Sequence, residues 1–178
     1  MVKIFLVIIE ILRVFDPLLI FFNPLLASIG SLILDGVDGI LFFRAGYKWQ
    51  TYNLVDKIMD YWWYIFILIY SINLPIFTII LVLFVYRTIG QAIGLVTMKE
   101  KYYIFFPNIL EWFFDFFIVI QLFGFAHLFS SGNFNIIILG LSSCIAFYIE
   151  WRTHIKRDSI IAKNILKTTL DWSKNEVK

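Results

Sequence analysis

The stretch Phe116–Ile149, FFIVIQLFGFAHLFSSGNFNIIILGLSSCIAFYI, contains no Asp, Glu, Lys or Arg. Two other stretches, Pro17–Leu34 and Tyr61–Tyr86, are equally free of charged side chains. A membrane-spanning helix needs roughly 20 mostly apolar residues. The first stretch is long enough for more than one span, with Ser130–Asn133 as the break inside it. These stretches predict an all-α integral membrane protein.

The composition of the 178-residue chain excludes an ordinary soluble domain. Hydrophobic residues make up 61% and charged residues 16%, whereas soluble domains are nearer half apolar and a quarter charged. The net charge of +2 is too small to indicate a nucleic-acid partner. The only cysteine, Cys144, cannot form a disulfide within the chain, and its apolar neighbours predict a buried side chain.

Hydropathy and turn residues predict a bundle of about six transmembrane helices in residues 1–150, followed by a basic amphipathic tail in residues 151–178. The expected helices cover residues 3–22, 24–43, 53–70, 76–95, 107–129 and 136–149. The first helix contains Glu10, Arg13 and Asp16, so it either spans the membrane or lies at the interface. Glu10 and Arg13 are three residues apart and could pair on one helical face.

The basic residues indicate how the helices are oriented. Lys and Arg occur in the loop after the second helix, in the loop after the fourth helix and in the tail, and the other three turns contain neither. Cytoplasmic loops of membrane proteins are enriched in Lys and Arg. The alternation therefore predicts that both termini lie in the cytoplasm.

Two pairs of aspartates flank the first basic loop. Asp35 and Asp38 are three residues apart, and Asp56 and Asp60 are four apart, so each pair lies on one face of its helix. Consecutive helices joined by a short loop are expected to be antiparallel neighbours, which brings the four carboxylates to a similar depth. Their mutual repulsion calls for a counter-charge, and oxygen ligands suit Mg²⁺, Mn²⁺ or Ca²⁺. The pattern predicts a site for one or two divalent cations, with solvated acids at a helix end as the alternative.

The spacing of the aspartates resembles the signature of the CDP-alcohol phosphatidyltransferases, D-x2-D-G-x2-A-R-x8-G-x3-D-x3-D. The matching residues, in register over residues 35–60, are Asp35, Asp38, Gly39, Asp56 and Asp60. Six membrane helices with the motif on the second and third also resemble the core of this family.

Three positions depart from the signature. Phe42 and Phe43 replace the Ala-Arg pair, with Arg44 one position later, and Tyr52 replaces the second glycine. In the family that glycine leaves room for the cytidine nucleotide. Tyr52 therefore either fills this pocket or stacks on a different base, and Gly46 could replace the glycine if the loop is rearranged.

The resemblance implies a homodimeric enzyme of phospholipid biosynthesis with its active site at the cytoplasmic face. It would transfer a substituted phosphoryl group from a CDP-linked alcohol to an acceptor alcohol and release CMP. The ligands of two Mg²⁺ or Mn²⁺ ions would be Asp35, Asp38, Asp56 and Asp60. Asp60 would also act as the general base. The residues in contact with the nucleotide or the acceptor phosphate would be Gly39, Asp35, Arg44 and Arg87.

Several alternatives stay open. Arg87 either binds phosphate or extends along apolar surface to the membrane interface. Glu111 and Asp115 either line the active site or form a structural ion pair with Arg87, and the second interpretation is preferred. The chain could instead be a cation or proton transporter, which predicts acids spread through the membrane depth, or a relative of the family without catalytic activity.

Overall fold

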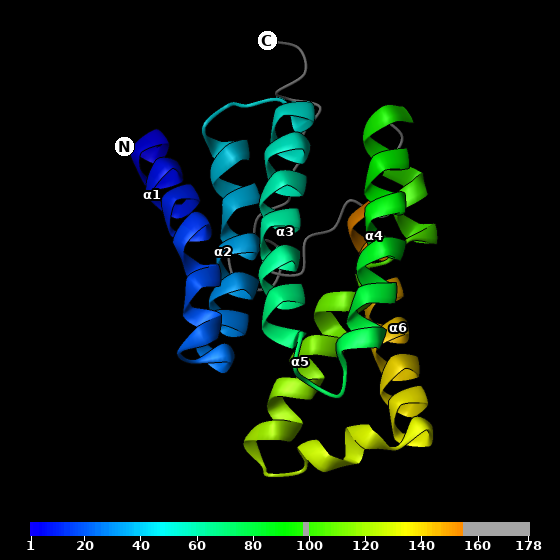
Figure 1. Cartoon of the computed structure of the whole chain (residues 1–178). Helices are drawn as coiled ribbons and strands as arrows, with labels where there is room; N and C mark the ends of the chain where they lie inside the picture. Colours follow the sequence, from blue (N-terminus) through cyan, green and yellow to red (C-terminus); the bar gives the residue numbers. More distant parts are fainter. Residues whose placement is uncertain (98–99, 155–178) are drawn as a thin grey trace. The chain divides into compact units, whose positions relative to one another are not determined.

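The computed structural model describes residues 1–97 and 100–154, and every regular element in these ranges is a helix (Figure 1). The α-helices are α1 (Val2–Phe15), α2 (Pro24–Arg44), α3 (Trp49–Ser71), α4 (Phe77–Thr97), α5 (Ile109–Leu122) and α6 (Gly132–His154). Between them lie the short 3-10 helices η1 (Asp16–Phe21), η2 (Glu100–Phe105) and η3 (Ala126–Ser130). The prediction of an all-α chain with about six helices is confirmed.

Three helices among the described residues are long and apolar enough to cross a membrane, namely α2, α4 and α6. α3 has a similar length but carries Asp56, Lys57 and Asp60. α1 and α5 have 14 residues each, which corresponds to roughly 21 Å at 1.5 Å per residue, shorter than the hydrocarbon core of a bilayer. The fold is therefore compatible with a membrane protein.

The observed boundaries differ most from prediction in the first and fifth helices. The α-helix expected over residues 3–22 ends at Phe15, because Pro17 has no N–H to continue the hydrogen-bond ladder, and the chain goes on as η1. The helix expected over residues 107–129 ends at Leu122. Gly124 follows with a φ of +81°, a conformation that glycine adopts readily and that reverses the chain into η3.

The described chain divides into two compact units, with the boundary inside α3 between Trp63 and Tyr64. In the first unit, α1 packs along α2, and η1 folds back against α2. α2 begins at Pro24, where the side chain of Asn23 accepts a hydrogen bond from the Leu26 N–H at 3.1 Å. This unit contains all four aspartates of the signature.

The second unit is built around aromatic side chains of α5 and η3. Phe117 and Phe129 meet edge to face with ring centroids 5.0 Å apart, and Phe113 contacts the same Phe129 ring. α5 packs on α6, and η2 packs on α4. Gly90 permits the close approach of the residues after η2, because a Cβ at this position would overlap the side chain of Phe106.

The structure tests the predicted end of α6 and the predicted burial of Cys144, but not the predicted tail. α6 continues to His154, so it extends past the end predicted at residue 149, and residues 155–178 of the predicted tail lie outside the described residues. Cys144 is exposed, so the prediction of a buried thiol is wrong. The reason is that only 17% of the candidate span in α6 is buried, so Cys144 lies on an outward-facing part of the helix.

Candidate metal centre

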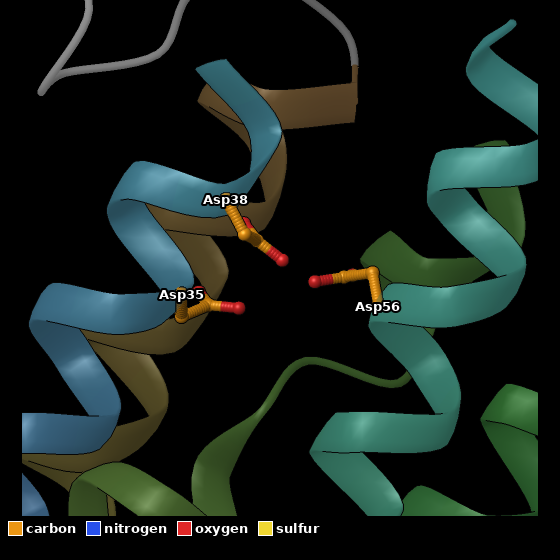
Figure 2. Close-up of side chains that lie close together, drawn as sticks. All are labelled: Asp35, Asp38 and Asp56. Carbon is orange, nitrogen blue, oxygen red and sulfur yellow. The ribbon is translucent and has the colours of Figure 1, made fainter. Parts of the chain in front are cut away.

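The first unit brings together three of the four predicted metal ligands. Figure 2 shows Asp35 and Asp38 on α2 pointing toward Asp56 on α3. One carboxylate oxygen of each residue lies within 4.8 Å of the other two. Asp38 is fully buried and Asp56 is 6% exposed, whereas the Asp35 side chain is 49% exposed. The helical spacings therefore produce a cluster with two buried carboxylates and one at its rim.

Arg13 of α1 lies among the aspartates. This contact was not predicted from the sequence. Its Nη1 donates to Asp38 Oδ2, and its Nη2 donates to Asp35 Oδ1 at 3.0 Å. The same Nη2 is 3.5 Å from Asp56 Oδ1 and 3.5 Å from Asp60 Oδ1. In this structure Arg13 therefore pairs with the aspartates and not with Glu10, its possible partner on the same helix, because four carboxylates attract the guanidinium more strongly than one.

Lys57 provides the second counter-charge and connects Asp60 to the cluster. Its Nζ donates to Asp56 Oδ2 at 2.7 Å and to Asp60 Oδ2 at 2.9 Å. Arg44 is the last residue of α2 and is exposed. The four carboxylates thus face two cationic side chains, and two negative charges remain in excess.

The donor set fits a hard divalent cation. All the grouped ligand atoms are carboxylate oxygens, which suits Mg²⁺ or Mn²⁺ better than zinc. Asp56 Oδ1 is shielded from solvent and has no hydrogen-bond donor within the described part of the chain. A divalent cation would offset much of this negative charge and provide a closer partner for this oxygen than Arg13 at 3.5 Å.

The space next to the aspartates is filled by an aromatic side chain. A Cβ at Gly39 would lie 3.0 Å from the hydroxyl oxygen of Tyr52, so the Tyr52 ring lies directly against the Gly39 backbone. The ring also packs on Phe42 and Trp49, with centroids 5.5 Å and 5.2 Å apart. Of the two interpretations of Tyr52, the structure supports the one in which the ring fills the space beside Gly39.

Gly46 does not take the place of the second glycine of the signature. It follows the end of α2 with a φ of +80°, in the left-handed conformation that commonly terminates helices. A Cβ at this position would touch nothing within 4 Å. Gly46 therefore turns the chain between α2 and α3, and Tyr52 remains the residue in contact with Gly39.

Arg87 belongs to the second unit and forms a buried ion pair there. Its Nη1 lies 2.9 Å from Glu150 Oε1 and also donates to the carbonyl oxygen of Phe106. Arg87 is 2% exposed and Glu150 is 6% exposed, which excludes the interpretation of Arg87 as a residue extended to the membrane interface. Glu150 directly follows the longest charge-free stretch and was not among the site residues predicted from the sequence.

Glu111 has a local structural role at the start of α5. The Asn108 side chain donates to Glu111 Oε2 at 2.6 Å, and its amide oxygen accepts from the Glu111 N–H at 3.4 Å. This reciprocal arrangement is a helix cap. Asp115 follows one turn later on the same helix.

Comparisons of the chain with family models, with curated proteins and with solved structures find no match. The functional assignment therefore rests on the geometry of the described residues and on the resemblance over residues 35–60.

Proposed function

We propose that the chain is a membrane-embedded phosphotransferase, which moves a substituted phosphoryl group from a CDP-linked alcohol to an acceptor alcohol and releases CMP. One observation carries the proposal. Asp35, Asp38 and Asp56, whose spacing resembles the family signature, place three carboxylate oxygens within 4.8 Å of one another. Buried carboxylates repel a diphosphate, so such a cluster serves phosphoryl transfer only when it holds divalent cations.

The aspartates would hold Mg²⁺ or Mn²⁺, in the two-ion arrangement that the resemblance implies. Asp38 and Asp56 are the buried ligands, and the exposed Asp35 lies where a donor could approach. When bound, the cations would neutralise the donor's diphosphate and stabilise the leaving CMP.

Asp60 is the proposed general base. Lys57 and Arg13, 2.9 Å and 3.5 Å from its carboxylate oxygens, hold Asp60 beside the cluster. In the reaction, the acceptor oxygen forms a bond to the donor phosphorus, and the phosphorus–oxygen bond to CMP breaks. The acceptor's proton passes to Asp60.

The membrane topology is part of the proposal. The three candidate spans α2, α4 and α6 support insertion into a membrane. The alternation of basic loops in the sequence is the ground for proposing six spans, with both termini and the active site on the cytoplasmic side. The homodimer and the lipid substrates follow from the resemblance. The clustering of four aspartates in one unit favours an enzyme site over the distributed acids of a transporter.

CMP release tests the proposal. Purified protein in lipid micelles, supplied with Mn²⁺, a panel of CDP-alcohols and pooled acceptor alcohols, is expected to release CMP only when the cation is present. Asp60→Asn should lower the rate by about 10²-fold or more, because general-base catalysis contributes on this scale. Absence of CMP release from folded, Mn²⁺-binding protein with every donor in the panel would contradict the assignment.

Tyr52→Ala is expected to improve the use of CDP-alcohols. A nucleotide can lie against Gly39 only after the Tyr52 ring leaves its contacts with Phe42 and Trp49. Two aromatic contacts are worth about 1–3 kcal/mol, so KM for the donor should fall by roughly five- to a hundredfold. Tyr52→Phe keeps the ring and is the matched control, with an expected KM near that of the wild type. An unchanged or higher KM in Tyr52→Ala would show that the ring does not obstruct the donor.

A further inference from the structure

Arg13 occupies the space that a cation bound by the aspartates would need. Its guanidinium contacts Asp35 Oδ1, Asp38 Oδ2 and Asp56 Oδ1, and its side chain is only 7% exposed. A guanidinium and a divalent cation a few ångströms apart repel each other strongly where water is excluded. The two cannot both lie among the same carboxylate oxygens, so Arg13 must move when a cation binds.

A second partner for Arg13 is already present on α1. Glu10 lies one turn before Arg13, and both of its carboxylate oxygens are shielded from solvent without a hydrogen-bond partner in the described part of the chain. A shielded carboxylate without a donor is costly.

The geometry of a helix allows Arg13 to reach Glu10. Side chains three residues apart are neighbours on the helix surface, and long side chains lean toward the helix N-terminus. Arg13 is on the C-terminal side of Glu10, so its side chain leans in the required direction. Rotation about the side-chain bonds of Arg13 would bring its guanidinium toward Glu10 without movement of α1.

We propose that Arg13 is a built-in competitor of the divalent cation and alternates between two partners. It neutralises the aspartates when no cation is bound, and it pairs with Glu10 when a cation enters. The inference rests on the proposed cation site and adds to it a determinant of cation affinity on α1, outside the signature.

The two residues are expected to have opposite effects on cation binding, although neither is a ligand. Arg13→Met removes the competitor and should tighten Mn²⁺ binding by about tenfold or more, since a positive charge a few ångströms away repels the cation strongly where water is excluded. Glu10→Gln removes the second partner and should weaken Mn²⁺ binding by roughly three- to tenfold. In the Arg13→Met background, Glu10→Gln should have little effect, because the arginine that needs this partner is absent.

Mn²⁺ titrations followed by electron paramagnetic resonance test the proposal without measuring activity. The proteins are the full chain in lipid micelles as wild type, Arg13→Met, Glu10→Gln and the double variant. Lys3→Met is the matched control, because it removes a positive charge from α1 at a residue that lies over the Tyr47 ring. Its Mn²⁺ affinity should equal that of the wild type.

Several outcomes would overturn the proposal. If Glu10→Gln weakens binding equally with and without Arg13, Glu10 acts through its own charge and the exchange of partners is wrong. If folded Arg13→Met binds Mn²⁺ no more tightly than the wild type, Arg13 is not a competitor. Should Arg13→Met fail to fold, Arg13→Lys replaces it, and tighter binding is still expected because one ammonium cannot bridge the aspartates. No Mn²⁺ binding by the wild type would contradict the cation site itself, together with this inference.

Discussion

Asp38→Asn is expected to abolish the stabilisation of the protein by Mn²⁺ and to reduce CMP release to background. Asp38 is the fully buried member of the cluster and lies within 4.8 Å of the ligand oxygens of Asp35 and Asp56. The substitution removes one negative charge and a central ligand from the cluster. Wild-type protein at a hundredfold excess of Mn²⁺ over Kd should gain about 2.7 kcal/mol, which corresponds to a rise in Tm of roughly 5–10 °C.

The control for Asp38→Asn is Asp35→Asn, the same substitution at the exposed member of the cluster. The side chain of Asp35 is 49% exposed, so solvent can replace part of its contribution, and Asp35→Asn should retain a reduced rise in Tm. Thermal unfolding with and without Mn²⁺ measures both variants. An Asp38→Asn protein that Mn²⁺ stabilises as much as the wild type would contradict the role of Asp38 as a ligand.

Arg87→Met is expected to cause the largest loss of stability in the second unit. The substitution leaves Glu150 buried without its 2.9 Å partner and removes a donor to the Phe106 carbonyl oxygen. Loss of one partner from a buried ion pair costs about 3–5 kcal/mol. Thermal unfolding in lipid micelles should show the change as a much lower Tm.

The double variant Arg87→Met with Glu150→Met distinguishes a structural role of Arg87 from a role in binding the acceptor. Without either charge, neither member of this ion pair is left buried without the other, so most of the lost stability should return. If the double variant is stable and transfers phosphoryl groups normally, the role of Arg87 is structural. If Arg87→Met alone leaves Tm unchanged and raises KM for the acceptor, the ion pair contributes little, and the interpretation of Arg87 as a ligand of the acceptor phosphate, implied by the resemblance, is supported.

The sequence predicted the features that depend on local patterns. Charge-free stretches and turn residues indicated an all-α chain, and the Asn23-Pro24 boundary correctly placed the start of α2. The spacing of three between Asp35 and Asp38 determined which face of α2 they share, and the short connection to α3 brought Asp56 opposite them. These features could be predicted because they depend only on the geometry of a single helix and on the length of one short loop.

The partners of the charged residues were not predictable in this way. Arg13 is 25 residues from Asp38 in the chain, and helical spacing suggested Glu10 as its partner. Glu150 is far in sequence from Arg87, and nothing in the pattern links them. In both cases the pairing depends on how separate helices pack, which a single sequence does not encode in its local spacing.

The divalent cation site is tested most directly by titrating the purified wild-type chain with Mn²⁺ in lipid micelles and following the titration by electron paramagnetic resonance. The proposed site predicts saturable loss of the free Mn²⁺ signal, its return when excess Mg²⁺ is added, and no such loss with Asp38→Asn protein. A free Mn²⁺ signal that folded wild-type protein leaves unchanged would contradict the claim that the aspartates form a divalent cation site.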